Sequence, residues 1–332
     1  MIPPRSFRRV FGYALALAAT ATLSARAAEG VQLTDQGGKV RVEINGQFFT
    51  DYHYKDVPRP YFYPVIGIGD APMTRNFPMK TVPGEETDHK HHRGLWYGHQ
   101  SVNGTSFWGE TGKEGKVVHE KFLELKSGAD VGVIVAQNKW VATNGTVVCT
   151  DVRTIRIHNL KDERVLDFDI TFTAGGTELV FGDDKDGAMS IRVAESMRLK
   201  HGKINAGKPT GNIVLSTGDR DQTTWGKQAA WCDYHGPVGD KIVGVAIFDH
   251  PTNPRHPTWW HVRDYGLFCA NPFGKRHFEN LKDLKDRKAG DYKVEAGKTV
   301  TWRYRYYFHA GDEKQSKVAE HYAEYVKATA AK

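Results

Sequence analysis

The sequence predicts an all-β protein, a large antiparallel β-sandwich with a C-terminal helix. Two observations carry this prediction. Apolar residues alternate with polar ones over many short segments, and pairs such as Asn-Gly and Gly-Gly separate these segments. The chain lacks the alternation of strands and helices that would indicate a parallel sheet. Because all-β folds of roughly 300 residues are commonly one domain, residues 28–332 are expected to form a single sandwich.

The strands are predicted from their β-branched content and their two-residue period. The clearest strand covers residues 147–157, with the sequence VVCTDVRTIRI. Further strands are expected at residues 40–44, 131–141, 165–173, 242–248 and 299–308. Turns are expected at Asn45-Gly46, Asn103-Gly104, Asn144-Gly145, Gly175-Gly176 and Asp186-Gly187.

One helix is predicted close to the C-terminus. Asp312 is a suitable N-cap, and Gln315 follows it by three residues, as in a capping box. The next apolar residues recur at helical spacing and form one stripe: Val318, Ala319, Tyr322, Tyr325 and Val326. We therefore expect the helix to pack against a sheet.

The first 27 residues are predicted to be a cleaved signal peptide. Arg5, Arg8 and Arg9 precede an apolar run over residues 10–19, and Ala25-Arg26-Ala27 fits a small-x-small cleavage site. The apolar run is too short for a permanent span. A periplasmic or secreted protein without stable membrane insertion is expected. Arg8-Arg9 also resembles a twin-arginine signal, so the export route stays open.

Charge and cysteine content narrow the classes of protein. Residues 1–27 hold four Arg and no acid, so removing them lowers the formal charge from +7 to +3. No basic block is dense enough to indicate nucleic-acid binding. In an oxidising compartment Cys149, Cys232 and Cys269 allow one disulfide, but three buried thiols are favoured.

Two short segments hold six of the 15 histidines and are the candidate site. Histidine titrates near neutral pH and is a common metal ligand, so such clusters indicate catalysis or binding. The first segment is residues 88–96, DHKHHRGLW. If it enters a strand, His89, His91 and Arg93 share one face and His92 points to the other.

Three interpretations of this first segment stay open. His89 and His91 suit two metal ligands, although a cation such as Arg93 on the same face weighs against a metal. Alternatively, Arg93 holds an anionic substituent while a histidine acts as acid or base. The plain alternative is a solvated polar turn.

The second segment is residues 249–263, DHPTNPRHPTWWHVR. Its three prolines fix the backbone and make a stiff loop, which would present His250, Arg255 and His256. In the strand expected after it, Trp259, His261 and Arg263 would share a face. Ordinary turn chemistry accounts for the prolines but not for these histidines and arginines.

Acidic residues lie between the two histidine segments. The stretch at residues 183–187, DDKDG, matches no complete EF-hand loop, so a solvated turn is favoured over a Ca²⁺ site. Arg192 and Glu195 follow it. One interpretation is that they form a structural ion pair. The other is that Glu195 serves as the carboxylate partner of a catalytic histidine.

Residues 88–96, 184–187, 248–259, 264–267 and 271–274 resemble the bacterial methane oxygenase PmoA-like family. The resemblance covers most of the chain after residue 27. It implies a secreted protein of sugar degradation and supplies no catalytic set, so the site residues are inferred from this sequence alone.

The leading hypothesis is a carbohydrate-active enzyme, a lyase or a hydrolase. The residues assigned to catalysis are His91, His256, Arg93, Arg255 and Glu195. The residues assigned to substrate binding are His89, His92, Trp96, Asp186, Arg192, His250, Trp259, His261 and Asn271. A lyase is favoured, because a glycosidase of the usual kind needs two facing carboxylates and the acids here are scattered.

Two other classes stay open. One is a metal-dependent oxygenase or hydrolase, for which His89, His91 and His256 are candidate ligands of a divalent metal. The other is a non-catalytic sugar-binding module. The sequence contains no P-loop, dinucleotide-binding glycine motif, Gly-x-Ser-x-Gly or His-Glu-x-x-His, which excludes the chemistries those motifs serve.

Overall fold

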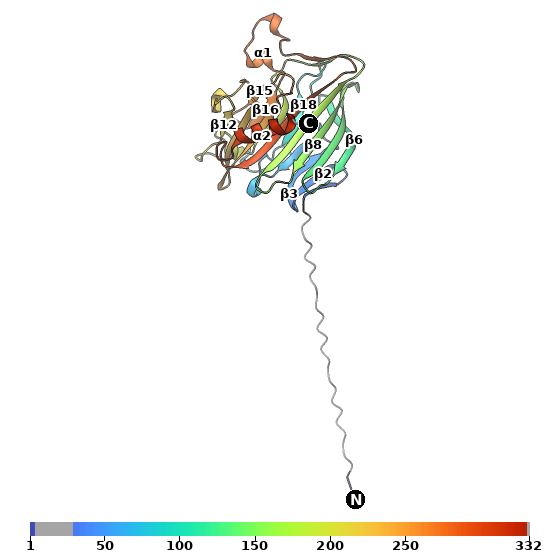
Figure 1. Ribbon diagram of the computed structural model, residues 1–332, viewed down its shortest axis with the longest axis vertical. Coiled ribbons are helices and arrows are strands. Elements are labelled where there is room, and N and C mark those ends of the chain that lie inside the picture. Colours follow the sequence, from blue (N-terminus) through green and yellow to red (C-terminus); the bar gives the residue numbers. More distant parts are fainter. Residues whose placement is uncertain (4–28, 331–332) are drawn as a thin grey trace.

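Two eight-stranded antiparallel sheets stack face to face and form the body of the molecule (Figure 1). The computed structural model describes residues 1–3 and 29–330. Apart from its first three residues, the predicted signal peptide lies outside the described residues. The prediction of an all-β sandwich with a C-terminal helix is confirmed.

The first sheet has the strand order β1-β2-β3-β4-β5-β11-β16-β15. Its strands are β1 Val31–Asp35, β2 Lys39–Ile44, β3 Gln47–His53, β4 Tyr61–Val65, β5 Leu95–His99, β11 Gly187–Arg192, β16 Leu267–Asn271 and β15 Trp259–Val262. This sheet therefore joins the N-terminal strands to strands that follow both histidine segments.

The second sheet has the order β12-β13-β14-β18-β9-β8-β7-β6. Its strands are β12 Asn212–Leu215, β13 Trp231–Val238, β14 Lys241–Asp249, β18 Thr299–Ala310, β9 Arg164–Ala174, β8 Val147–His158, β7 Val131–Val141 and β6 Lys116–Lys126. Every strand paired in this sheet runs antiparallel to its neighbours.

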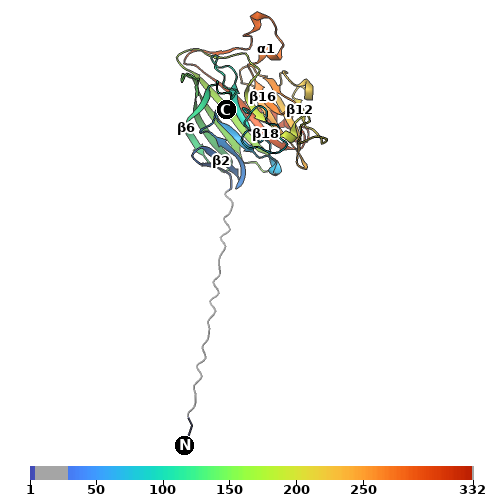
Figure 2. The same ribbon diagram turned by 180° about the vertical axis from the view of Figure 1, so that it is seen from behind.

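Smaller elements complete the described chain. They are the strand pair β10 Leu179–Phe181 and β17 Tyr292–Val294, the helices α1 Lys275–Phe278 and α2 Val318–Ala330, and the 3₁₀ turns η1 Ile68–Asp70, η2 Glu195–Met197, η3 Asp221–Thr223 and η4 Leu284–Asp286. The segment that carries α1 projects beyond the ends of the sheets (Figure 2).

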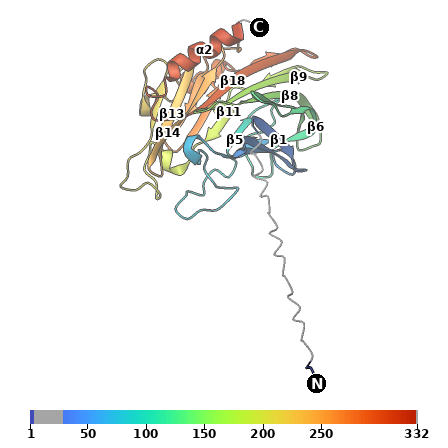
Figure 3. The same cartoon turned by 60° about the horizontal axis from the view of Figure 1, so that its bottom comes forward.

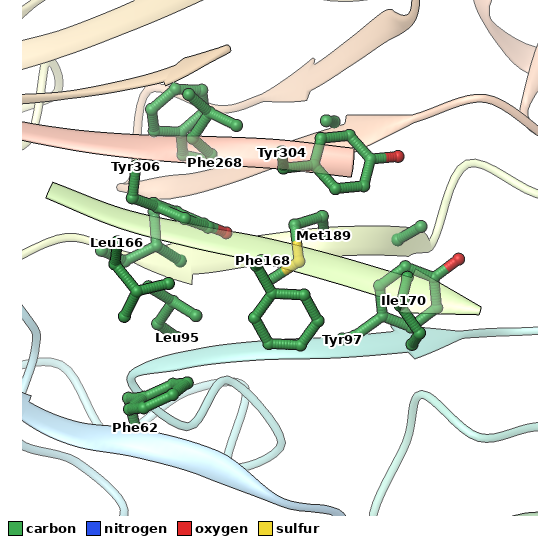
Figure 4. Close-up of a cluster of buried hydrophobic side chains, with 14 of the residues drawn as sticks. Phe62, Leu95, Tyr97, Leu166, Phe168, Ile170, Met189, Phe268, Tyr304 and Tyr306 are labelled. Carbon is green, nitrogen blue, oxygen red and sulfur yellow. The ribbon is translucent and has the colours of Figure 1, made fainter. Parts of the chain in front are cut away.

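The main core lies between the two sheets, because alternate residues of each strand point inward. Leu95, Tyr97 and Met189 of the first sheet face Phe168 and Tyr306 of the second (Figure 4). Burial alternates along β7 and β8 in step with this geometry. The two-residue period in the sequence therefore follows from the sandwich, in which every second residue of a strand faces the core.

Helix α2 covers the outer face of the second sheet (Figure 3). Val318 and Tyr325 of the helix pack with Phe248 and Tyr307 of the strands. The predicted capping box is present: Asp312 Oδ1 accepts the backbone N–H of Gln315 at 2.8 Å, and Gln315 Oε1 accepts that of Asp312 at 3.1 Å. It closes a turn before the helix, which begins six residues later, at Val318.

The strand predictions agree with the structure to within two residues at either end. Asn45-Gly46 forms the turn between β2 and β3, with positive φ at both residues, as a tight hairpin requires. Asp186-Gly187 was predicted as a turn between strands, but β11 already begins at Gly187. Asp186 instead directly precedes this interior strand, and its side chain lines a cavity described below.

Cys149, Cys232 and Cys269 are buried and free, so the expectation of three buried thiols is confirmed and no disulfide joins them. Burial raises the pKa of the Cys149 and Cys269 thiols, which keeps them protonated and unreactive. In the part of the chain that the structure describes, no helix has the length and hydropathy of a membrane span.

Replacing a side chain from between the sheets tests this core. Phe168→Ala removes a ring that is 1% exposed and is expected to lower the free energy of unfolding by about 3–5 kcal/mol. Urea denaturation measures the change. The control is Leu123→Ala on the edge strand β6, where the side chain is 51% exposed and the expected change is below about 0.5 kcal/mol. Equal losses in both variants would contradict the assigned core.

Candidate functional site

A cavity of about 400 Å³ on the outer side of the first sheet gathers the first histidine segment. Its wall comes from loops around residues 89–92, 108–114 and 185–186 and from the chain after β15. The lining residues are His89, His91, His92, Gln100, Trp108, Gly109, Thr111, Glu114, Lys185, Asp186, His261, Arg263, Tyr265 and Leu267. This size lies within the roughly 300–1,000 Å³ of small-molecule sites.

The strand registers explain how the first sheet supports this cavity. Trp96 of β5 pairs with Ser190 of β11, Ser190 with Cys269 of β16, and Cys269 with His261 of β15. These four residues form one row across the sheet. Their flanking residues Leu95, Ile191 and Val262 point into the core, so the row faces outward.

The histidine segment is a loop and not a strand, so the predicted alternation of His89, His91 and His92 is wrong. Strand β5 begins only at Leu95. His89 has a φ of 44°, and its carbonyl accepts the backbone N–H of His92 at 3.0 Å. This tight turn brings the three rings together instead of separating them: the ring centroids of His91 and His92 are 4.4 Å apart.

Buried arginines hold the loop from below. The Arg75 guanidinium donates to Asp88 Oδ1 at 2.5 Å and to the backbone carbonyls of Asp88 and His89 at 2.9 and 3.1 Å. Arg192 donates to Asp88 Oδ1 and to Glu195 Oε1, at 3.4 Å each. Arg198 donates to Glu195 Oε2 at 2.6 Å. Glu195 is therefore the anion of a structural network, one of the two roles expected for it.

Asp88 stays ionised in this network. Burial acts to raise its pKa, but the hydrogen bond from His89 and the charges of Arg192 and Arg75 lower the pKa far below its ordinary value. The His89 ring donates from Nδ1 to Asp88 Oδ2 at 2.7 Å. That ring also stacks on His92 and on Tyr265, with centroid separations of 4.9 and 5.2 Å.

The protonation of His92 follows from its contact with Arg192. Arg192 Nη1 donates to His92 Nδ1 at 3.2 Å, and a guanidinium only donates, so the proton of the His92 ring is on Nε2. This Nε2 is buried without a hydrogen-bond partner among the described residues. Burial and the charge of Arg192 lower the pKa of His92 well below its ordinary value, so the ring is neutral.

His91 is the imidazole with the most freedom to react. Arg59, itself buried, donates to the backbone carbonyl of His91 at 3.2 Å and to that of Trp108 at 2.6 Å, which fixes both cavity walls. Among the described residues no hydrogen bond reaches the His91 ring. Burial and then the charge of Arg59 lower the pKa of His91 to about 4. At neutral pH the ring therefore has an uncommitted lone pair.

His261 supplies a second neutral imidazole. Its Nδ1 donates to the carbonyl of Lys185 at 2.6 Å, which leaves Nε2 as an acceptor. Burial lowers the pKa of His261 to about 4, although the Asp186 carboxylate, 3.9 Å from Nδ1, acts to raise it. Lys185 Nζ lies 3.0 Å from Asp186 Oδ1.

Cations and aromatic faces complete the cavity. The Arg263 guanidinium lies 5.6 Å from the ring centre of Tyr265 and 5.8 Å from that of Trp225. Burial raises the pKa of Tyr265 to about 12, so its hydroxyl keeps its proton. Trp108 contributes a second aromatic face, close to His91 and His92.

Some predicted site residues lie elsewhere. Arg93 does not enter the cavity lining but forms a two-pronged ion pair with Glu110, at 2.9 and 2.7 Å. Arg255 donates to the carbonyls of Pro272, Gly290 and Asp291. These hydrogen bonds hold the loop around α1 in place. These contacts make both arginines structural, which corrects the roles expected for them.

The second histidine segment meets the first only at its C-terminal end, and its other site candidates lie outside the cavity. His256 Nδ1 donates to the buried Asp249 at 2.8 Å, and His250 lines a separate groove on the outer face of the second sheet. Trp259 is buried. Asn271 donates to the carbonyls of Asp184 and Lys185, so it positions the Asp186 loop. Of this segment His261 and Arg263 line the cavity.

The sequence reasoning missed several residues of the site. Arg263 was expected to share a face with His261 but was not assigned to the site, and Tyr265 follows two residues later. Arg59 and Arg75 gave no sequence signal, because single arginines far from the histidines do not reveal a buried contact. Trp96 lies beneath the histidines, stacked on His92, and does not line the cavity.

The predicted metal ligands do not converge. Within residues 29–330, one group of three His, Cys, Asp or Glu side chains has ligand atoms within 4.8 Å of one another, and it consists of Asp233, His235 and Glu313. His89, His91 and His256 form no such group. The sequence reasoning did not single out any member of the observed group.

The comparisons with known proteins identify the family. A model for the family of unknown function DUF6807 matches residues 39–323. The chain belongs to this family. No curated protein matches the sequence.

Several solved structures share part of the DUF6807 chain's architecture. They include an alpha-galactosidase from Lactobacillus brevis (9% identity, 86% of this chain and 40% of that chain, TM-score 0.41). A second is a polysaccharide lyase (11% identity, 86% of this chain and 33% of that chain, TM-score 0.35). A third is a glycoside hydrolase family 97 enzyme from Pseudoalteromonas sp. strain K8 (9% identity, 83% of this chain and 34% of that chain, TM-score 0.32). The chain spans 33–40% of the length of these proteins. All three TM-scores lie below 0.5, so these likenesses assign neither activity nor substrate.

Removing the anion beneath the loop tests the buried network. Glu195→Leu leaves Arg192 and Arg198 with an uncompensated buried charge and is expected to lower the free energy of unfolding by about 3–5 kcal/mol. Urea denaturation measures the loss. Glu320→Gln, which breaks the exposed pair with Lys317, is the control and should leave the midpoint unchanged. An unchanged midpoint in Glu195→Leu would show that the network does not hold the loop.

Proposed function

We propose that this DUF6807 protein is a carbohydrate-active enzyme, a lyase that acts on an acidic sugar in the cavity on the first sheet. The observation that carries the proposal is the meeting of two neutral imidazoles, His91 and His261, with the cations Lys185 and Arg263 in one cavity. The aromatic faces of Trp108 and Tyr265 suit the apolar faces of a sugar ring.

The lyase step needs a base, a cation and an acid. The base removes the proton from the carbon next to the sugar carboxylate, the electron pair forms a carbon–carbon double bond, and the bond to the leaving oxygen breaks. His91 has the free lone pair for the first task, and Arg263 suits the carboxylate on which charge builds up. Tyr265 keeps its hydroxyl proton and can give it to the leaving oxygen.

The carboxylates of the cavity favour a lyase over a glycosidase. A usual glycosidase needs two carboxyl groups free to react. Among the described residues that line the cavity, Asp186 and Glu114 are the two acids, and Glu114 accepts the backbone N–H groups of Thr111, Gly112 and Lys113 at 2.8–3.0 Å. Glu114 therefore closes its own loop, and Asp186 is left without a carboxylate partner.

The activity itself is the first test. We expect the protein to cleave a uronic-acid glycan and to release an unsaturated product that absorbs ultraviolet light. His91→Asn should lower kcat/KM by about 10²–10⁴-fold, because the base is lost. His321→Asn on α2, outside the cavity, is the matched control and should keep full activity. Saturable glycan binding without turnover would instead favour the sugar-binding module.

The pH dependence is a second test, because the base must be neutral. Since burial lowers the pKa of His91 to about 4, the ring loses its lone pair only below that pH. The kcat/KM profile should therefore fall on the acid side with a midpoint at about 4. A midpoint near the ordinary histidine value of about 6.5 would be inconsistent with a buried base.

A further inference from the structure

Four side chains on the outer face of the second sheet form a cluster separate from the cavity: Asp233, His235, His309 and Glu313. We propose that this cluster binds a divalent transition metal of the zinc class. The proposal is independent of the lyase activity. The cluster lies on the opposite sheet, beneath the turn that leads into α2.

The strand register brings the ligand atoms together. Asp233 and His235 lie two residues apart on β13 and so share a face. His235 pairs with Gly244 of β14, and Gly244 pairs with His309 of β18, so the two histidines flank a glycine. A Cβ at position 244 would collide with the His309 ring. Gly244 therefore leaves the space through which His309 reaches Asp233.

The turn after β18 adds the fourth side chain. Ligand atoms of Asp233, His235 and Glu313 lie within 4.8 Å of one another, and all three residues are buried. His235 Nδ1 is 2.6 Å from Asp233 Oδ1 and 3.8 Å from Glu313 Oε2. His309 Nε2 is 2.7 Å from Asp233 Oδ2. The ligand atoms of Asp233, His235 and Glu313 thus lie together, and His309 contacts the second carboxylate oxygen of Asp233 from beside them.

Apart from its histidines, the cluster carries a net negative charge. Asp233 and Glu313 bring two negative charges, and Arg220, which donates to Glu313 Oε1 at 2.8 Å, brings one positive charge. A divalent cation held by the two carboxylates would offset their negative charge.

The surroundings match those of a metal site. Metal-bound histidines commonly donate their second ring N–H to a backbone carbonyl, and bound carboxylates are themselves hydrogen-bonded. Here Arg220 holds Oε1 of Glu313 while Oε2 stays toward His235, and His309 contacts Oδ2 of Asp233. A histidine nitrogen among the ligands favours zinc over calcium or magnesium, which prefer oxygen ligands alone.

A metal here would join two parts of the chain. β13 and the turn before α2 would share one set of ligands, which would fix the start of the helix on the sheet. Because the four side chains of the cluster are buried, the role we infer is structural.

The experiment is Zn²⁺ titration of the purified, chelator-treated chain by calorimetry, with melting temperature as a second readout. We expect one equivalent of Zn²⁺ to bind and to raise the melting temperature, with no such effect from Mg²⁺ or Ca²⁺. Glu313→Gln keeps the shape of the side chain but removes a charged ligand, and it should weaken Zn²⁺ binding by at least about tenfold. His309→Gln is the second variant and should have the same effect.

The control is His158→Asn on the same face of the sheet. His158 also bonds a carboxylate, Asp167, at 2.8 Å, but belongs to no group of three ligands among the described residues. Its loss should leave Zn²⁺ binding unchanged. The proposal is overturned if the wild-type chain binds no Zn²⁺, or if Glu313→Gln and His309→Gln both bind it as tightly as the wild type.

Discussion

The candidate site depends on two arginines, Arg75 and Arg192, that are fully buried beneath the histidine loop. A buried guanidinium costs several kcal/mol unless acceptors surround it. Here Asp88 and Glu195 provide the charge, and the loop's own carbonyls accept hydrogen bonds from Arg75. If the loop moved away, the buried arginines would lose hydrogen-bond acceptors. Its imidazoles are therefore held in place before any substrate arrives, which is what a catalytic group requires.

In the first sheet, one face forms the core and the opposite face supports the cavity. The inward residues, such as Leu95 and Ile191, make the core, and the outward row from Trp96 to His261 supports the cavity. Since successive residues of a strand point to opposite faces, one short strand serves stability and the site together. The same rule places Asp233 and His235 outside the core of the second sheet, while their neighbours Cys232 and Tyr234 point inward.

Much of the fold could be predicted from the sequence, because the two-residue period of a strand can be recognised without knowing which strands it pairs with. Strand β7 and the hairpin at Asn45-Gly46 follow directly from local chemistry. The site could be predicted only in part. His91 and His261 could be identified because other histidines lie near them in the sequence. The turn at His89, which brings the histidine rings together, could not be predicted from the sequence. Arg255 looked like a substrate fork and instead binds three carbonyls, since an arginine's role depends on acceptors distant in sequence.

The partners of each histidine decide what it can do. In the cavity, burial and neighbouring arginines hold His91 and His92 neutral, so that a lone pair or an N–H is available for chemistry. In the second sheet, His158, His235 and His309 each contact a carboxylate. Burial acts to lower the pKa of His235, but the hydrogen bond to Asp233 raises it above its ordinary value. The clustering of histidines along the sequence finds only the group in the cavity, because His158, His235 and His309 stand singly in the chain. Neighbours in space distinguish the two groups, because a nearby cation favours the neutral ring and a nearby carboxylate favours the charged one.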